Sequence, residues 1–495
     1  MRTPRVTIIG GGAGGLAASI DLARRGVDVT LLEAGPYCGG KIRQLRPGGN
    51  VGVDAGPTVV TMRWVFEQLF QDAGVSLSDY LTLHQTDVLV RHTWTTGGIL
   101  DLFADNEKSA AAIEAFAGKQ EAQGFRDLCV RARRAYQILE APFIKGPRPS
   151  AVYLATCFNP REMLAASPFK TLWKALQQHF RDPRMLQLFG RYATYTGSSP
   201  FLSPATLLLI VNVEQQGVWL PEGGIISIAR AMARVAEEKG VTIRTNAPVA
   251  EVLTKNGQAA GVKLANGEQI ESDAVICAAD FRALAAGLFG QKVAKSVPRA
   301  KPKHRSMSAV TWALRAKTNG FDMSRHNVFF ATCLASEFND AFRHGRLPGK
   351  PTIYVCAQDR GQPGQDPGND PERLLIQVNA PANGDSHHYT AAEIEECARI
   401  TFGQLETCGL TVERGSAEEI ATPTDFEKLF PATGGALFGQ ALHGSLSAFR
   451  RPGARSALPR LYLAGGSVHP GPGVPMATLS GRQAADSLLQ DLTSR

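Results

Sequence analysis

Val6-Thr7-Ile8-Ile9-Gly10-Gly11-Gly12-Ala13-Gly14-Gly15 is the stretch of sequence that decides the fold. The β-branched run predicts a buried parallel strand that leads into a glycine turn. Gly10, Gly12 and Gly15 satisfy G-x-G-x-x-G: the first glycine makes a tight turn, the second admits a pyrophosphate, and the third lets helix and strand pack closely. Apolar residues at helical spacing follow, and Gly26 supplies a C-terminal stop.

A second predicted strand begins at Val27 and ends at Glu33, twenty-three residues after Gly10. A carboxylate at this place can accept hydrogen bonds from ribose hydroxyls. The pyrophosphate would lie on the free N–H groups at the start of the helix, where Ala13 and Gly14 stand. A glycine turn without a ligand is the alternative, but strand, helix, second strand and acid in register favour a dinucleotide site.

The segments that follow favour FAD over a nicotinamide cofactor. Gly39-Gly40-Lys41 comes where a nicotinamide domain would continue with another helix and strand, and it offers amides and a cation to a diphosphate, with a simple turn as the alternative. A helix from Ile228 to Lys239 and strands up to Ala278 follow much later. Near the end, a strand enters Gly465-Gly466, and Val474-Pro475-Met476 precedes a helix from about Thr478. Its N-terminus can hold partial negative charge on a reduced flavin ring.

The length of 495 residues predicts two intertwined domains rather than one small core. We expect an α/β protein in which a Rossmann-like FAD-binding domain is interleaved with an α+β substrate domain. The FAD-binding domain is predicted over residues 1–75, 216–300 and 440–495. The substrate-binding domain, with its helical insert, is predicted over residues 76–215 and 301–439.

Residues 76–215 are predicted to be mainly helical, and residues 305–383 contain strand-like runs that precede a helix from about Ala391 to Leu405. Such strands would form an antiparallel sheet that makes one wall of a long apolar pocket. Within the helical part, apolar residues from Phe169 to Phe180 form a stripe that contains Trp173 and is flanked by lysines. This stripe is either an interfacial membrane helix or core packing.

Composition limits the partners. Hydrophobic residues make up 44% and charged residues 20%, as in an ordinary globular enzyme, and the net charge of +8 favours an anionic surface. No block of five like charges points to nucleic acid, so a membrane surface fits at least as well. The eight cysteines include no C-x-x-C pair, which predicts reduced thiols and no metal site. We expect a cytoplasmic protein peripherally associated with the inner membrane, without a spanning segment.

The order of these motifs resembles a known family. G-x-G-x-x-G, Glu33, Gly39-Gly40-Lys41, Asp54-Ala55-Gly56-Pro57-Thr58 and the glycine-rich run 464–471 are similar to the bacterial carotenoid (phytoene-type) desaturases of the flavin amine oxidase group. The resemblance covers essentially the whole chain. Within the family, segments 58–63 and 188–195 are most similar to the hydroxyneurosporene desaturases of purple phototrophic bacteria, also called 1-hydroxycarotenoid 3,4-desaturases or methoxyneurosporene dehydrogenases.

The resemblance implies FAD as the cofactor, and the absence of cysteine between Leu461 and Gly481 makes it noncovalent. Val249 would contact the adenine through its backbone. Lys41 stands where many relatives carry arginine, which puts a bidentate phosphate grip in doubt. The residues expected around FAD are Gly10, Gly12, Ala13, Gly14, Gly15, Glu33, Gly40, Lys41, Val249, Gly466, Val474, Pro475 and Met476.

The activity implied is hydride transfer to flavin during introduction of a C-3,4 double bond into 1-hydroxyneurosporene- or methoxyneurosporene-type substrates, in spheroidene or spirilloxanthin biosynthesis. Oxygen or a quinone would then take the electrons. His469 is the best titratable candidate for proton handling, with capping of its turn as the alternative. The candidates for binding a terminal hydroxyl or methoxy group are Arg191, Tyr192, Thr194 and Tyr195, with helix-end packing as the alternative.

Three competing interpretations stay open from the sequence. One is a general phytoene desaturase, and another is an amine or porphyrinogen oxidase of the same fold. The third is a lipid carrier without flavin, which would have no physical need for the phosphate-binding glycines and Glu33.

Overall fold

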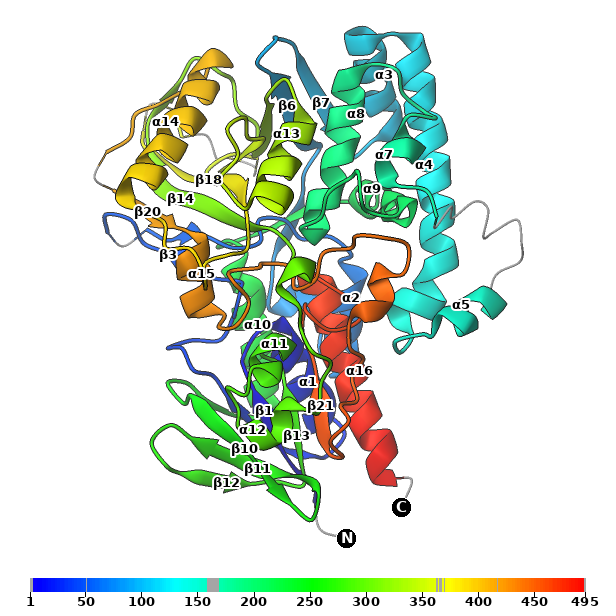
Figure 1. Cartoon of the computed structure of the whole chain (residues 1–495), viewed down its shortest axis with the longest axis vertical. Helices are drawn as coiled ribbons and strands as arrows, with labels where there is room; N and C mark the ends of the chain where they lie inside the picture. The colour runs from blue at the N-terminus through cyan, green and yellow to red at the C-terminus, as the bar shows by residue number, and fades with distance from the viewer. Residues whose placement is uncertain are drawn as a thin grey trace.

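The computed structural model describes residues 3–49, 51–157, 169–361, 364, 367–368, 370–415 and 417–493. Figure 1 shows two parts stacked along the long axis of the molecule. The lower part holds both chain termini and the elements β1, β13, β21, α1 and α16, and the upper part holds a large sheet with helices on either side. The chain passes between the two parts several times.

A five-stranded parallel sheet, in the order β21-β13-β1-β2-β9, forms the centre of the lower part. Its strands are β1 (Arg5–Ile9), β2 (Asp28–Leu32), β9 (Thr242–Arg244), β13 (Ala274–Cys277) and β21 (Leu461–Leu463). Three widely separated segments therefore build one sheet. The expected alternation of strand, helix and strand at the N-terminus is confirmed.

Helices cover one face of this sheet. They are α1 (Ala13–Ala23), α10 (Ile226–Glu238) and α16 (Val474–Thr493), which begins four residues before the predicted start. Their apolar residues share one core with Val6, Ile8, Val29 and Leu31. The other face packs against the antiparallel sheet β10 (Val249–Lys255), β11 (Gln258–Leu264) and β12 (Gln269–Glu271), and Asn256-Gly257 forms the predicted hairpin turn. This produces the three layers of a nucleotide-binding domain.

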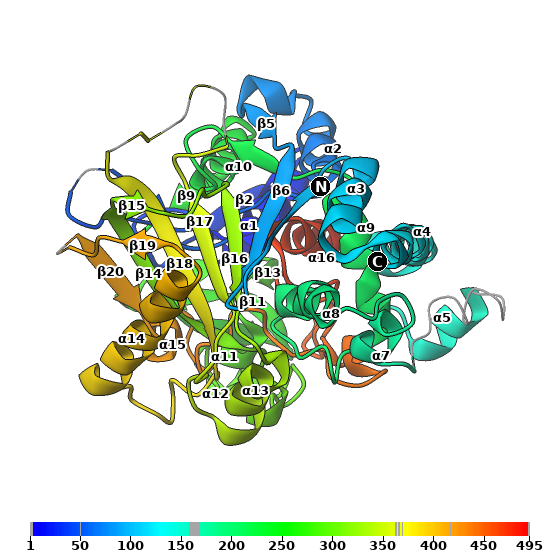
Figure 2. The same ribbon diagram turned by 90° about the horizontal axis from the view of Figure 1, so that it is seen from above.

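A seven-stranded sheet, in the order β20-β14-β18-β17-β16-β6-β7, forms the centre of the upper part. All neighbouring strands are antiparallel except β16 and β6, which are parallel. The strands are β6 (Val88–Trp94), β7 (Ile99–Phe103), β14 (Ser308–Ala316), β16 (His326–Phe330), β17 (Ile353–Ala357), β18 (Glu372–Ala380) and β20 (Glu418–Ala421). The runs predicted in 305–383 are confirmed as strands. Helix α14 (Ala391–Thr407) covers one face, as Figure 2 shows from above.

Helices cover the opposite face of the seven-stranded sheet (Figure 2). They are α3 (Asn106–Ala117), α4 (Lys119–Leu139), α7 (Leu172–Leu176), α8 (Pro183–Gly190) and α9 (Leu209–Gln215), and α5 (Ala151–Cys157) lies beyond them. The prediction of a mainly helical segment over 76–215 missed β6 and β7, which lie inside it. The two strands escaped notice because their stability comes from pairing with each other and with β16.

The stripe from Phe169 to Phe180 is mostly core rather than an interfacial helix. Leu172, Leu176 and Phe180 are almost completely buried, and the helix formed there, α7, has five residues. Trp173 packs on Phe201 with ring centroids 4.6 Å apart. Of this stripe only Phe169, which is 80% exposed, faces solvent. The interfacial interpretation of this helix is therefore wrong.

Smaller elements complete each part. Helix α2 (Trp64–Asp72) packs on α1 and α16, and α15 (Pro423–Leu429) packs on β14. Other short elements are β3 (Gln44–Leu45), β4 (Val53–Asp54), β5 (Leu83–Gln85), β8 (Trp219–Pro221), α11 (Phe281–Ala285), α12 (Gln291–Ala294), β15 (Thr318–Asn319), α13 (Leu334–Asn339) and β19 (Thr411–Val412). No helix in the described part of the chain is both long enough and apolar enough to span a membrane.

Candidate active site

One large cavity runs from the glycine turns of the lower part to the seven-stranded sheet of the upper part. Its volume is about 1040 Å³, at the upper limit of the roughly 300–1,000 Å³ typical of a pocket for one small ligand. Gly10, Glu33 and Val249 line it at one end, and Tyr354 and Asn379 line it at the sheet. The cavity therefore connects a possible cofactor site at the glycine turns with a second region at the sheet.

The first glycine turn has the geometry that its sequence predicts. Gly10 adopts φ +98°, a left-handed conformation that favours glycine. A Cβ atom on Gly15 would lie 2.0 Å from the carbonyl oxygen of Gly10, so only glycine permits this approach of helix to strand. Gly15 is buried beneath the turn and does not line the cavity itself.

The start of helix α1 opens into the cavity. Its N-cap residue is Gly12, no side chain caps the helix, and Ala13 and Gly14 line the cavity. A Cβ on Gly12 would have no atom closer than 3.9 Å, so the space beside it is free. Amides without partners at the positive end of a helix dipole suit a pyrophosphate.

Glu33 lies at the end of β2, beside this turn. Its Oε2 accepts a hydrogen bond from the Gly11 N–H at 2.7 Å, and its Oε1 accepts one from the Gly35 N–H at 2.8 Å. Each carboxylate oxygen keeps a further lone pair, and the side chain lines the cavity. Glu33 is thus fixed in orientation and can accept hydrogen bonds from ribose hydroxyls.

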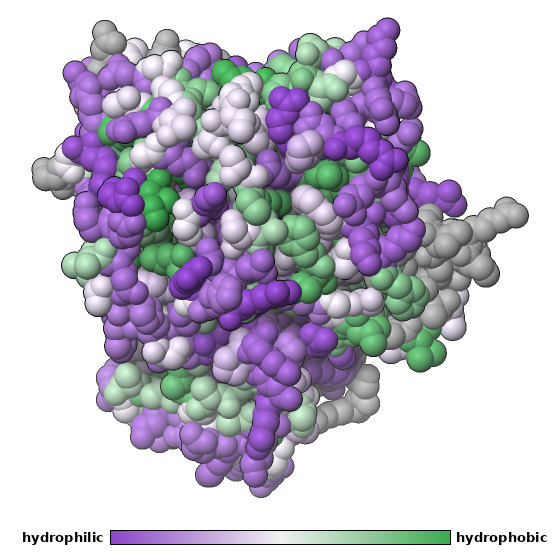
Figure 3. Space-filling view, turned by 45° about the horizontal axis from the view of Figure 1, so that its top comes forward, coloured by the Kyte–Doolittle hydropathy of each residue, from purple (hydrophilic) through white to green (hydrophobic). Residues whose placement is uncertain are grey.

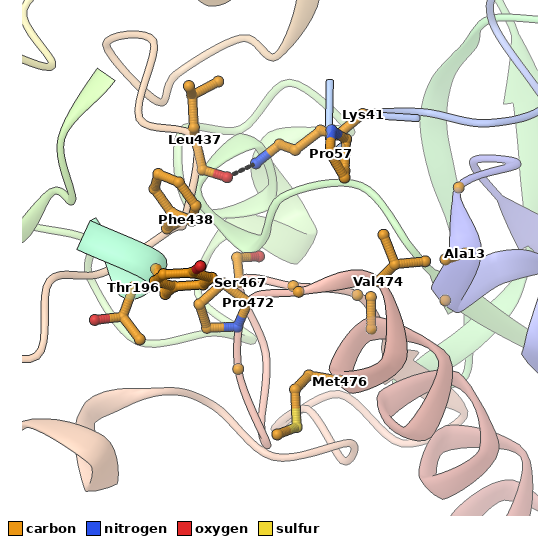
Figure 4. A pocket seen from close by; sticks show the side chains of 18 of the residues that line it. Ala13, Lys41, Pro57, Thr196, Leu437, Phe438, Ser467, Pro472, Val474 and Met476 are labelled. Carbon is orange, nitrogen blue, oxygen red and sulfur yellow. Dashed lines mark hydrogen bonds between the residues drawn. The ribbon is translucent and has the colours of Figure 1, made fainter. Parts of the chain in front are cut away.

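The second glycine pair lies directly against the first turn. The Gly39 N–H donates to the Gly11 carbonyl at 2.9 Å, and a Cβ on Gly40 would lie 3.1 Å from the Cα of Gly12. Lys41 lines the cavity, but its Nζ donates to the Leu437 carbonyl at 2.5 Å (Figure 4). The same Nζ lies 5.1 Å from the centre of the Phe430 ring. Burial lowers the pKa of Lys41. Its ammonium therefore reaches toward the loop that carries Leu437.

The C-terminal turn and helix α16 complete this end of the cavity. Gly466, Val474, Pro475 and Met476 all line it, and Figure 4 shows Val474 and Met476 projecting from the first turn of α16. The N-terminus of a helix of this length carries partial positive charge and faces the cavity. Together with the two glycine turns and Glu33, these groups fit a dinucleotide with a flavin ring.

The expected substrate residues lie at another part of the same cavity. Arg191, Thr194 and Tyr195 line it, and all three belong to the 3-10 helix η3 (Arg191–Thr196) that follows α8. Tyr192 does not line the cavity, because its ring is buried against Phe189 and its hydroxyl donates to Glu214. Tyr192 therefore lies outside the cavity and contacts the site through Glu214.

Glu214, on α9, is a site residue that the sequence analysis missed. It lines the cavity, is 4% exposed, and accepts hydrogen bonds from the hydroxyls of both Tyr192 and Tyr195. Burial raises the pKa of Glu214. The Arg191 guanidinium lies 5.7 Å from the ring centres of Tyr195 and Tyr354. These side chains, from η3, α9 and β17, form a polar cluster inside a mainly apolar cavity.

No local signal separated Glu214 from other glutamates. It follows an ordinary apolar helical run, Leu207–Val213, and its tyrosine partners are nineteen and twenty-two residues earlier in the chain. The tyrosine pair of η3 and a lone glutamate on α9 are the only hint in the sequence, and that hint does not say that they meet.

His469 is not among the residues that line the cavity, although its neighbour Pro470 is. The ring is 2% exposed, its Nε2 lies 3.2 Å from the Gly146 carbonyl oxygen, and it packs edge-on against Phe143. Burial lowers the pKa of His469 to about 4. This placement favours the alternative in which His469 anchors its turn, and we assign it no part in proton transfer.

Fold and site together define a flavoprotein oxidoreductase with a large, mostly apolar cavity. The family described as flavin containing amine oxidoreductase matches residues 13–489, and the chain belongs to this family. It is an FAD-dependent oxidoreductase with the flavin amine oxidase fold.

Proteins similar over the full length are known. The chain is 48% identical to a hydroxyneurosporene desaturase of Rubrivivax gelatinosus, across 100% of this chain and 95% of that one. It is 43% identical to a hydroxyneurosporene desaturase of Cereibacter sphaeroides, across 99% of both. Among solved structures, putrescine oxidase bound to putrescine gives a TM-score of 0.61 at 15% identity, with 100% of each chain covered. That degree of identity supports the fold alone.

Proposed function

We propose that this enzyme desaturates acyclic carotenoids and introduces the C-3,4 double bond into 1-hydroxyneurosporene- or 1-methoxyneurosporene-type substrates. The observation that carries the proposal is a single cavity in which an apolar chamber joins the dinucleotide cradle to a buried polar cluster. The names of the relatives that are 48% and 43% identical over the full length support the same substrate class.

FAD, when bound, supplies the hydride acceptor that no side chain can provide. The chain itself holds the polyene and keeps water out. Leu207, Ile210, Val213 and Val218 contribute to the apolar wall, and an uncharged polyene gains its affinity chiefly from such burial. Desaturation also removes a proton from the carbon next to the one that loses the hydride. A strong base is not required for this proton, because the developing allylic cation makes it acidic.

The polar cluster explains how such a chamber would select an oxygenated end group. Arg191, Thr194 and Tyr195 place polar groups on a wall that is otherwise mainly apolar. Sites built around a hydroxyl reject analogues that lack it, because the buried polar groups are then left without partners. The tyrosine pair on Glu214 would hold this end of the chamber rigid.

The chamber also has a mouth that suits a lipid surface. Phe169 and Leu446 both line the cavity and are 80% and 60% exposed, so the cavity lining reaches the surface at these residues. Val152 and Tyr153 on α5 are exposed as well, and Arg148 bonds to the adjacent Phe449 carbonyl. Figure 3 shows hydrophobic residues gathered at the lower right, the side where α5 lies in Figure 1. We propose that the enzyme takes its substrate from an anionic bilayer through this mouth.

We also propose that one part of the chain binds FAD and that the other part binds the substrate. The FAD-binding part comprises 1–75, 216–300 and 440–495, and the substrate-binding part comprises 76–215 and 301–439. The five-stranded sheet lies within the first set of ranges, and the seven-stranded sheet lies within the second.

The test is turnover by the purified flavoprotein in liposomes, with 1-hydroxyneurosporene, 1-methoxyneurosporene, phytoene and putrescine as alternative substrates. We expect the first two to gain one double bond, seen as a red shift of the polyene absorption, and phytoene to react poorly. Successive desaturations of phytoene would instead identify a general phytoene desaturase. Oxidation of putrescine without carotenoid turnover would identify an amine oxidase.

A further inference from the structure

A buried histidine on the sheet side of the cavity has one ring nitrogen without a partner. His326, the first residue of β16, lines the cavity and is 1% exposed. Its Nδ1 lies 2.7 Å from the Tyr354 hydroxyl, whereas its Nε2 makes no hydrogen bond to any residue that the structure describes. Buried polar groups are nearly always paired, so this nitrogen requires an explanation.

The partners of His326 determine which nitrogen carries the proton. The Tyr354 hydroxyl also lies 2.7 Å from Thr58 Oγ1, which places Thr58, Tyr354 and His326 in one chain. A phenol donates more readily than it accepts, and a neutral imidazole nitrogen is a good acceptor. The arrangement that satisfies both preferences has the Thr58 hydroxyl donating to Tyr354 and the Tyr354 hydroxyl donating to Nδ1. The proton of the imidazole is then on Nε2.

His326 stays neutral in this position. Burial lowers its pKa to about 3, and the positive charge of Arg325 and of Arg191 acts in the same direction. A neutral ring has one N–H, and in this arrangement that donor is left without an acceptor. A buried N–H without an acceptor is unfavourable in free energy, and a ligand that supplies an oxygen to it removes this penalty.

The neighbourhood of His326 belongs to the polar cluster. The Arg191 guanidinium lies over the ring of Tyr354, the residue that holds His326, and over the ring of Tyr195. The His326 and Tyr354 rings are stacked, with 13° between their planes. His326 therefore adds a donor from the sheet to a cluster whose other members come from η3 and α9.

We propose that the Nε2–H of His326 is the specificity-determining donor to the oxygen atom at the end of an otherwise apolar substrate. This inference rests on the proposed function and names a residue that acts in it. Hydroxyl and ether oxygens both accept hydrogen bonds, so the donor serves 1-hydroxy and 1-methoxy end groups alike. A hydrocarbon end leaves the N–H unpaired. Tyr354 and Thr58 are positioning residues, because they fix the tautomer and orientation of the ring.

The experiment compares kcat/KM for 1-hydroxyneurosporene, 1-methoxyneurosporene and neurosporene, which lacks the oxygen, in the purified flavoprotein. We expect His326→Phe to reduce the preference for each oxygenated substrate over neurosporene about tenfold, the effect of one buried hydrogen bond. His326→Gln, which keeps an N–H donor, should recover part of the preference. Tyr354→Phe should reduce it by a smaller factor, because the donor remains but its tautomer is no longer fixed.

The matched control is His92→Phe. His92 lies on the neighbouring strand β6, is 2% exposed, and also has its pKa lowered to about 3, but it bonds to the Leu100 carbonyl and does not line the cavity. Its replacement should leave the preference as in the wild type. Flavin content and thermal unfolding, measured for every variant, show that the fold is retained.

Two results would overturn the inference. One is an unchanged preference in His326→Phe, and the other is a loss confined to the 1-hydroxy substrate, which would make Nε2 an acceptor. Failure of the proposed function is distinguishable from both, because the wild-type enzyme itself would then show no preference for the oxygenated carotenoids over neurosporene.

Discussion

Replacement of Glu33 by alanine should separate the cofactor from the enzyme without unfolding it. The carboxylate holds the Gly11 and Gly35 amides at 2.7 and 2.8 Å, and its remaining lone pairs face the cavity where a ribose would lie. A hydrogen bond to a charged group contributes about 1.5–3 kcal/mol, so losing two ribose bonds should weaken FAD binding by about 3–6 kcal/mol. Even the lower value corresponds to roughly a hundredfold rise in Kd.

The assay is flavin fluorescence on titration of the apoprotein, together with flavin retained after gel filtration. Asp28→Ala is the matched control, because Asp28 begins the same strand, is exposed and does not line the cavity. Glu33→Gln, with one acceptor oxygen instead of two, should fall between the alanine variant and the wild type. An alanine variant with full flavin occupancy and an unchanged Kd would refute the placement of the ribose at Glu33.

Three further outcomes are expected. Gly15→Val should abolish flavin binding and lower Tm by many degrees, because even its Cβ would lie 2.0 Å from the Gly10 carbonyl oxygen. The control is Gly403→Val, at an exposed helical glycine of α14 where a Cβ meets no atom within 4 Å, and it should cost far less; equal effects would argue against the packing role. The raised pKa of Glu214 means that the folded state holds its proton more tightly than the unfolded state, so its contribution to the free energy of unfolding falls as pH rises above about 4.5. Because glutamine does not titrate, the free energy of unfolding of Glu214→Gln should rise relative to that of the wild type as pH increases from 4 to 8. Urea unfolding measures this, and a difference between the two proteins that does not change with pH would contradict the raised pKa. Leu446→Glu and Val152→Glu should reduce sedimentation with anionic vesicles at low salt. Ile99→Glu is the control and should have no effect, because Ile99 is exposed on β7 and does not line the cavity. Vesicle binding that none of the three variants changes would leave the mouth without a membrane role.

The cofactor end of the site was predictable because its signals are local. Gly10 is required by a tight turn, and Gly15 is required because it lies against the Gly10 carbonyl only five residues later. Glu33 is marked by its place at the end of the next strand. The hairpin at Asn256-Gly257 was predictable for the same reason. In each case, backbone geometry dictates the residue type, so the residue type reveals the geometry.

The stripe from Phe169 to Phe180 shows the limit of periodic patterns. Apolar residues at helical spacing must face something apolar, but a bilayer and a protein core both satisfy that demand. The pattern could not say that Leu172 and Phe180 lie in the core beside α4 and α8, or that within the stripe only Phe169 is exposed.

The sequence by itself determined that the chain binds a dinucleotide and, through its resemblance, which family it belongs to. Only the tertiary structure brought Glu214 of α9 to Tyr195 of η3, and His326 of β16 to Tyr354 of β17 and Thr58. It also placed His469 outside the cavity lining. The physical reason is that a phosphate is held by the backbone of one continuous turn, whereas a cluster in an apolar chamber is made of single side chains from separate elements. The partner of each such side chain is set by packing over hundreds of residues and leaves no spacing in the sequence.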